Sequence, residues 1–239
     1  MTDQDTDTRF AMTGTPAMSA HVPASSRVFE ELRARIIAMT LPPGTRLSRA
    51  DLAETFGVSQ SPIREAMLRL EQVGLVVSYR QSRTEVTYID RARLHEESFL
   101  RTGIECEVIN HLAAQGAAAD LGKARGILKM QTALADDPDQ IALFRELDED
   151  FHRQLFRVAG HEGLHDLVRE RSSQMSRLRT LDLPSKGKMQ SVIDGHAAIL
   201  DAIHAGDRHG AVDAMRKHLS GTIDRLPEIV RQYPDCFSR

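Results

Sequence analysis

Residues 51–74 read DLAETFGVSQSPIREAMLRLEQVG and decide how the N-terminal part of the chain folds. The stretch divides into two short amphipathic segments, because apolar residues recur at helical spacing on both sides of Gly57. Ser59 is placed to cap the second helix, and Pro62 fits inside its first turn. Such a pair leaves short polar residues and arginine at the exposed leading end of the second helix, from which side chains reach base edges and phosphates in a major groove. The pattern predicts a helix-turn-helix.

The flanking residues favour a winged helix over an arbitrary pair of packed helices. Upstream, LPPGTRLS predicts a turn that follows a first helix over residues 25–39. Downstream, residues 75–79 and 84–89 read as two short strands, joined by a polar, basic tip at residues 80–83. We expect the exposed polar residues of this unit to contact DNA, namely Arg49, Ser59, Gln60, Ser61, Arg64 and Arg83.

Composition limits the class of protein. With 239 residues, 41% hydrophobic and 27% charged, the chain has room for two modest globular domains. The net charge of -3 means that DNA binding would depend on a local basic surface, such as the six arginines between residues 46 and 83. No apolar run approaches the roughly 18 residues of a membrane span, and the N-terminus is acidic where a signal peptide is basic. Cys106 and Cys236 show no ligand spacing. We therefore expect a cytoplasmic protein with no membrane partner.

The order of the segments predicts a mostly α protein, with an N-terminal winged helix-turn-helix followed by an all-α bundle of six or seven helices. We expect a disordered arm at residues 1–24, which are rich in Thr, Asp, Ser, Ala and Pro and show no periodicity. The winged domain then covers residues 25–90, and the bundle covers residues 91–230. Within the bundle, spacing and caps predict six helices and a short tail from Pro227, the helices covering residues 91–115, 121–134, 137–159, 162–181, 189–205 and 207–225.

Four polar side chains lie on apolar faces of the predicted bundle helices. Asp148 and His152 are one turn apart, so they project from the same face. His196 and His218 each lie beside an apolar stripe on a later helix. Burying such groups unpaired costs roughly several kcal/mol, so they need partners. One aspartate and three histidines could together bind Zn²⁺ or Ni²⁺, although core histidines are often hydrogen-bonded without a metal.

The run VFEELRARIIAMTLPPGTRLSRADLAETFGVSQSPIREAMLRLEQVGLV, residues 28–76, resembles the N-terminal domain of GntR-type bacterial transcriptional regulators. The resemblance lies in the PG turn, in L-x-x-x-x-L-A, and in G-V-S followed by P-I-R-E-A at fixed spacing. Gln60 stands where the family usually has arginine, and Gln81-Ser82-Arg83 replaces the usual Arg-Gly pair of the wing. Because glutamine suits adenine and arginine suits guanine, the resemblance implies the fold and not the operator sequence.

The second half is similar to the C-terminal FCD domain, the ligand-sensing domain of the FadR-like branch of these regulators. The shared pattern is D-x-x-F-H, then H-x-x-I-L-x-A-I-x-x-G-D, then H-L, and it covers roughly residues 94–226. The resemblance implies that this domain forms the dimer and binds an effector. It also implies four ligands to a divalent transition metal, Zn or Ni, at Asp148, His152, His196 and His218.

The same resemblance assigns an effector-binding residue on the first bundle helix. Members of the family tend to hold a ligand carboxylate with an arginine in R-x-x-x-E, which here is Arg101 before Glu105. A guanidinium matches a carboxylate in a two-pronged contact. An ordinary ion pair from Arg101 to Glu105, one turn apart on the helix, is the alternative. Arg177 and Arg179 are further candidates, although most arginines on such a helix face solvent.

The two resemblances imply a DNA-binding transcriptional regulator, expected to be a repressor and a homodimer on a pseudo-palindromic double-stranded operator. A small carboxylic acid at the metal site would change its operator affinity. Two alternatives remain open from the residues. An Asp/His₃ site could activate water in a hydrolase, but no general base stands in a recognisable motif, so we assign no catalytic residue and expect no enzyme. The metal itself could also be the signal, with no organic effector.

Overall fold

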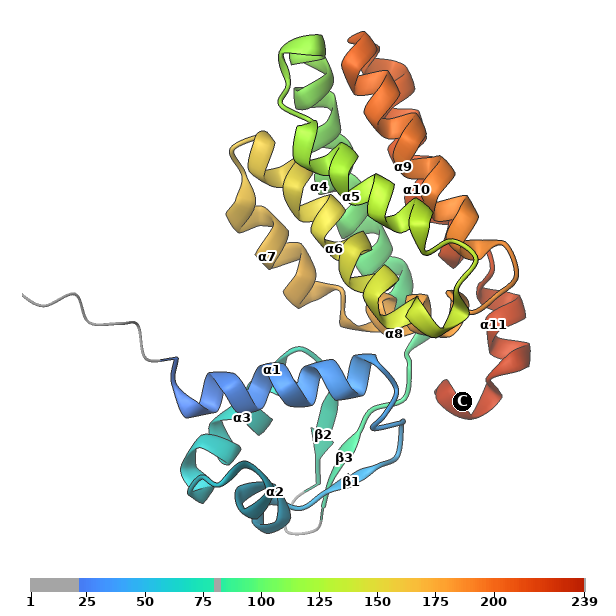
Figure 1. Ribbon diagram of the computed structural model, residues 1–239. Coiled ribbons are helices and arrows are strands. Elements are labelled where there is room, and N and C mark those ends of the chain that lie inside the picture. The colour runs from blue at the N-terminus through green and yellow to red at the C-terminus, as the bar shows by residue number, and fades with distance from the viewer. Residues whose placement is uncertain (1–21, 80–82, 239) are drawn as a thin grey trace, which may run out of the picture.

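The computed structural model describes residues 22–79 and 83–238. Most of the predicted N-terminal arm, residues 1–21, and most of the wing tip, residues 80–82, lie outside the described residues. Figure 1 shows a small domain of helices and strands below a larger bundle of helices. The predicted fold class, a winged helix-turn-helix followed by an all-α bundle, is confirmed.

The N-terminal domain combines three helices with a three-stranded antiparallel sheet in the order β1-β3-β2. The edge strand β1 was not predicted, because two residues carry no alternation signal. Leu47 of β1 pairs with Thr84 of β3. In chain order, the elements are α1 (Ala24–Ile37), β1 (Arg46–Leu47), α2 (Arg49–Phe56), α3 (Gln60–Gln72), β2 (Val76–Ser78) and β3 (Thr84–Val86).

Local sequence signals fix the helix-turn-helix. The Ser48 hydroxyl accepts a hydrogen bond from the backbone N–H of Asp51 and so caps α2. Gly57 ends α2 with φ of 61°, a left-handed conformation that glycine adopts without strain. On α3, Ile63 and Leu70 are fully buried in the core of this domain. The opposite face of α3 stays exposed, as a recognition helix requires.

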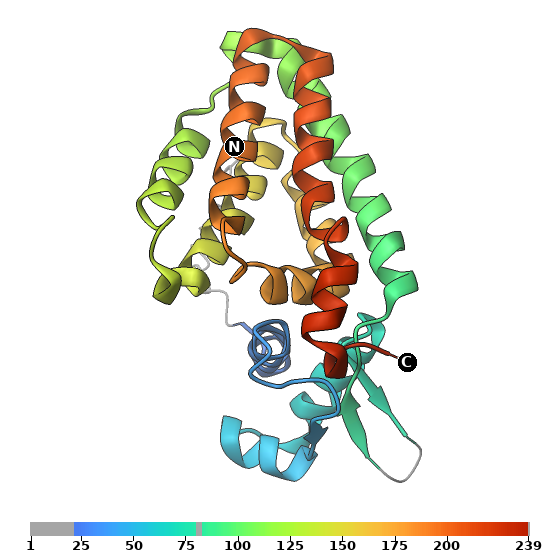
Figure 2. The ribbon, with the colours of Figure 1, turned by 90° about the vertical axis from the view of Figure 1, so that its right-hand side faces the viewer.

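The bundle begins at α4, the long helix that rises from the wing (Figure 1). Figure 2 shows α9 and α10 side by side, with α4 next to α10. Among the described residues, no helix is both long and apolar enough to cross a membrane. Besides three short 3-10 turns, the bundle contains α4 (Arg91–Gln115), α5 (Gly122–Ala133), α6 (Ile141–Val158), α7 (Glu162–Arg171), α8 (Ser173–Asp182), α9 (Lys188–Ala205), α10 (Arg208–Ile223) and α11 (Leu226–Gln232).

Two segments differ from the predicted ones. The single helix predicted for residues 162–181 is α7 and α8, separated at Ser172, whose φ of -115° and ψ of 33° are not helical. The break turns α8 across the end of the bundle, towards the N-terminal domain (Figure 1). The tail predicted from Pro227 instead forms α11, because proline is tolerated in a first helical turn. Beyond α11 the chain returns to the linker before α4, where Phe237 bridges Ile89.

One buried arginine joins α8 to the end of the wing. Arg177 is fully buried, and its Nη1 donates a hydrogen bond of 2.6 Å to the backbone carbonyl of Thr87. Its Nη2 donates to the Thr87 hydroxyl, to the Tyr88 carbonyl at 3.4 Å and to the Gln174 side chain. Gln174 in turn donates to the carbonyl of Gly74. Burial lowers the pKa of Arg177 to about 10, so the guanidinium keeps its charge at neutral pH.

Replacing Arg177 should therefore loosen the junction. We expect Arg177→Met to lower the free energy of unfolding by about 2 kcal/mol, because it leaves buried carbonyl groups without donors. It should also speed proteolysis of the linker at residues 87–90. Arg171→Met, which removes the same charge at an exposed position of α7, is the control. Equal denaturant midpoints and equal cleavage rates for the two variants would show that the junction does not depend on this side chain.

Candidate metal and effector site

The four residues predicted to bind a metal lie together inside the bundle. Asp148 and His152 come from α6, His196 from α9 and His218 from α10. Each offers one ligand atom, and these atoms all lie within 4.8 Å of one another. Asp148, His152 and His196 are buried, and His218 is half-buried. The one-turn spacing on α6 and the packing of three helices are what bring the donors to one point.

Hydrogen bonds on the outer ring nitrogens orient two of the histidines. The Nδ1 of His152 donates to the Glu105 carboxylate, which only accepts. The Nδ1 of His196 lies 2.8 Å from Oε1 of Gln131 and donates to it. In neutral imidazoles this leaves both Nε2 atoms as lone pairs directed at the cluster, the arrangement in which histidine binds a metal.

The inner donor atoms of the cluster lie close to one another. The Nε2 atoms of His152 and His218 are 3.2 Å apart, and Nε2 of His196 is 3.4 Å from Oδ1 of Asp148. The buried Nε2 of His196 has no hydrogen-bond partner among the described residues. An ion with metal–nitrogen distances of roughly 2.0–2.1 Å in tetrahedral geometry separates its ligand atoms by about 3.3 Å. The donor set therefore fits a divalent transition metal.

The two histidines from the later helices are held in their neutral, metal-binding form. Burial lowers the pKa of His196 well below its ordinary value, and the nearby His218 and His152 rings, whose protonated forms would repel a second positive charge, lower it further. Burial likewise lowers the pKa of His218, with His152 as the next cause. Gly195 makes the approach of His218 possible, because a Cβ at this position would lie 2.8 Å from Nδ1 of His218.

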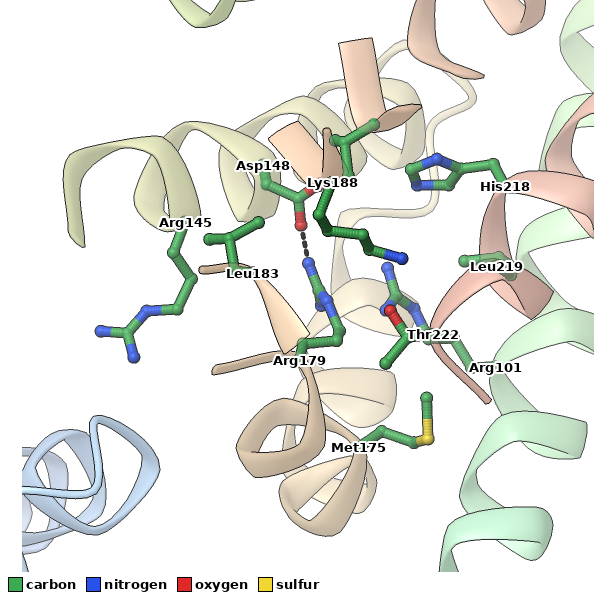
Figure 3. A pocket seen from close by; sticks show the side chains of 11 residues that line it. Arg101, Arg145, Asp148, Met175, Arg179, Leu183, Lys188, His218, Leu219 and Thr222 are labelled. Atoms are coloured by element: carbon green, nitrogen blue, oxygen red, sulfur yellow. Dashed lines mark ion pairs between the residues drawn. The ribbon is translucent and has the colours of Figure 1, made fainter. Parts of the chain in front are cut away.

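A cavity with a cationic lining opens beside the cluster (Figure 3). Its volume is about 40 Å³, where one water needs roughly 10–15 Å³, so it accepts the small polar end of a ligand. Figure 3 shows the Arg101 and Arg179 guanidinium groups and the Lys188 ammonium directed into the same space as Asp148. The full lining is Arg101, Arg145, Asp148, Met175, Arg179, Leu183, Lys188, Val192, His218, Leu219 and Thr222.

The position of Arg101 is compatible with both roles considered from the sequence, an ion pair with Glu105 and a contact with a ligand carboxylate. Its Nε donates to Glu105, so the i, i+4 ion pair is present, while the side chain also lines the cavity. Burial alone would raise the pKa of Glu105, but the charges of Arg101 and His152 outweigh it and hold that pKa well below its usual range. Glu105 therefore stays ionised and ties Arg101 to His152 of the cluster.

Of the cavity's other charged residues, only Arg179 was a further candidate from the sequence. Arg179 pairs with Asp148 and lies 3.9 Å from Glu149, and burial, followed by the charge of Arg101, lowers its pKa to about 9. Lys188 lies 2.9 Å from Asp182. Arginines on α8 were considered only as further candidates, since the helix pattern predicts that most of them face solvent. The break at Ser172 is what turns Arg179 inward.

The six residues predicted to contact DNA are all exposed, and they divide into two groups. Ser59, Gln60 and Ser61 form the N-terminal end of α3 and its cap. Arg49, Arg64 and Arg83 line a groove between α2, α3 and the wing, together with Arg46, which the sequence did not single out. Glu85 of β3 pairs with Arg46 at 3.3 Å and with Arg83. Four arginines around one groove form the local basic surface that DNA binding requires.

Comparisons with known proteins agree with both halves of this structure. Residues 24–86 match the family described as bacterial regulatory proteins, gntR family, and residues 98–221 match the FCD domain. The chain is 32% identical over 211 residues to an uncharacterized HTH-type transcriptional regulator in an unstable DNA locus of Streptomyces ambofaciens, covering 88% of each chain. It is 27% identical over 216 residues to the HTH-type transcriptional repressor RspR of Escherichia coli K12, covering 90% of this chain and 94% of that one.

A solved structure shows the same fold. Escherichia coli McbR/YncC matches with a TM-score of 0.72 and 19% identity, over 89% of this chain and 100% of that one. The family matches and this structural similarity together cover the helix-turn-helix, the helical bundle and their order in the chain. The chain belongs to the GntR family of bacterial transcriptional regulators and carries a C-terminal FCD domain.

Proposed function

We propose that the protein is a repressor whose operator affinity is set by a small organic acid bound at a metal in the FCD domain. One observation carries this proposal: four metal-type donor atoms within 4.8 Å of one another share a wall with a cavity lined by cations. A bound metal would act as a Lewis acid towards a carboxylate or hydroxyl oxygen. The cations beside it supply the matching charge.

In this proposal, each residue has a defined task. Asp148, His152, His196 and His218 would hold a divalent ion, with Zn or Ni as the metals that suit nitrogen-rich donors. Arg101 would bind the acid through the amino groups that its Glu105 contact leaves free, since that contact uses Nε. A guanidinium in this position favours a carboxylate over a neutral ligand.

Control of DNA binding requires that the acid favour one arrangement of the two domains over another. Helix α8 is suited to this task, because Met175 and Arg179 line the cavity while Arg177 contacts the end of the wing. A coupling of about 1–3 kcal/mol between the two sites would be enough to change operator occupancy. Relief of repression by the acid is the direction we expect.

We also propose that two copies act together in the cytoplasm on a pseudo-palindromic operator. A two-fold dimer would place two α3 helices in successive major grooves. The bundle offers an unpaired apolar side chain for such an assembly, since Phe99 on α4 is 83% exposed in the single chain. The groove arginines and the N-terminal end of α3 would then contact each half-site.

The metal is the first point to test. Purified wild-type protein should contain about one divalent transition metal per chain by mass spectrometry of the digested sample, and His152→Ala and His196→Ala should lose most of it, because each removes a ligand. His204→Ala is the matched control, since it removes an exposed histidine from the same helix as His196. A metal-free wild type, or equal metal in the His196 and His204 variants, would argue for hydrogen-bonded core histidines.

The effector contact can be separated from the metal. We expect Arg101→Lys to keep the charge but lose the planar fork, and so to weaken a bound carboxylic acid about tenfold with metal content unchanged. Calorimetric titration of the metal-loaded protein measures this change. Arg91→Lys, at an exposed position of the same helix, should bind the acid as the wild type does. If metal alone switches DNA affinity and no acid binds, the protein senses the metal.

The DNA contact has a similar control. Arg64→Ala should weaken operator binding by roughly 1–3 kcal/mol if Arg64 reads a base, measured by fluorescence anisotropy at fixed salt. Arg216→Ala removes the same charge from an exposed position of α10 and should leave affinity unchanged. Equal losses in both variants would mean that only net charge matters.

A further inference from the structure

A second cavity lies at the junction of the two domains. It has a volume of about 230 Å³ and is formed by α1 of the N-terminal domain and by α6, α7 and α8 of the bundle. We refer to it as the junction groove. Its lining consists of Arg33, Ala34, Ile37, Arg145, Glu146, Glu149, Arg153, Arg169, Ser176 and Arg179.

The lining is strongly cationic, with five arginines against two glutamates. Arg169 pairs with Glu30, and Arg153 pairs with Asp150. Arg33 and Arg145, in contrast, have no carboxylate within ion-pair distance among residues 22–79 and 83–238. Unpaired guanidinium groups in a cavity are an attraction for an anionic ligand.

Arg33 is a buried guanidinium in this groove with incomplete hydrogen bonding. It is 7% exposed, its Nη2 donates to the backbone carbonyl of Arg169, and its buried Nε has no hydrogen-bond partner among the described residues. Burying a cation whose Nε lacks an acceptor is costly, even with the carboxylates of Glu30, Glu149 and Glu170 nearby. Burial, followed by the charge of Arg169, lowers the pKa of Arg33, and the nearby carboxylates offset this only in part. An anion in the groove would relieve this cost.

The junction groove shares a wall with the metal cavity. Arg145 and Arg179 line both spaces, so two arginine side chains separate them. Arg145 donates at 3.2 Å to the Thr180 hydroxyl, and Arg179 pairs with Asp148 and lies 3.9 Å from Glu149. A ligand carboxylate could replace these contacts. A short molecule could therefore reach from one space into the other.

We propose that the junction groove receives a second acidic group of the effector, so that the effector is a short diacid that spans both cavities. This inference rests on the proposed function, because the first acid group is the one at the metal cavity. The second group would meet Arg33, which belongs to the N-terminal domain, together with Arg145 from the bundle. Such a ligand contacts both domains at once, and its affinity must then depend on how they are arranged.

Calorimetry with matched ligands tests this proposal on the full-length, metal-loaded protein. The probes are malonate, succinate, glutarate and adipate, each compared with its monomethyl ester, which has nearly the same length and one charge fewer. The best diacid should bind wild type about tenfold tighter than its ester, the scale of one charge-assisted hydrogen bond. Arg33→Gln should remove most of that preference and leave the affinity for the ester unchanged.

Two further variants keep the test independent of the stability of the Arg33 variant. Glu146→Gln removes an exposed negative charge from the groove lining, so it should strengthen binding of the diacid and not of the ester. Arg35→Gln, on the exposed side of α1 next to Glu31, should bind both as wild type does. Equal affinity for diacid and ester in wild type, or a preference insensitive to Arg33 and Glu146, overturns the diacid inference but leaves the effector site standing. If neither the diacid nor its ester binds, both the diacid inference and the proposed effector site are contradicted.

Discussion

The buried guanidinium of Arg177 fixes how the DNA-binding domain meets the bundle. A charge with no exposure to water needs acceptors, and both terminal nitrogens of Arg177 donate to backbone carbonyls of Thr87 and Tyr88, at the end of the wing. Backbone carbonyls cannot rotate independently as side chains can. The backbone of the linker is therefore held in one conformation while the contact with Arg177 is present. Gln174 extends the same contact to Gly74, where the chain leaves α3. The position of α3 is thereby tied to α8.

The opposite face of α8 lines the cationic cavity, so one short helix contacts both the wing and the cavity. Ten residues place Arg177 and Arg179 two positions apart, on different sides of one rigid element. A ligand that draws Arg179 away from Asp148 would therefore act on the same helix that carries Arg177. No long chain of contacts is required, because a single helix meets both the cavity and the wing.

The parts of this structure that depend on local residue spacing could be predicted from the sequence. The helix-turn-helix followed from the apolar spacing around Gly57, and the Asp148 and His152 pair followed from a one-turn separation that any helix imposes. The features that it missed depend on distant segments. The break at Ser172 has no glycine or proline to mark it, and the roles of Glu105 and Gln131 exist only once α4 and α5 pack against α6 and α9.

Asp148 links the histidine cluster, the cationic cavity and α8. One carboxylate oxygen faces His196 within the cluster, and the other pairs with Arg179. In the proposed function, a bound ion would draw the same carboxylate inward and so weaken its attraction for Arg179. The Arg179 guanidinium would then be freer to bind an incoming acid, because its positive charge would no longer be balanced by Asp148. Metal and acid should accordingly bind in that order, because the ion both supplies a ligand position and releases the cation that completes the acid's site.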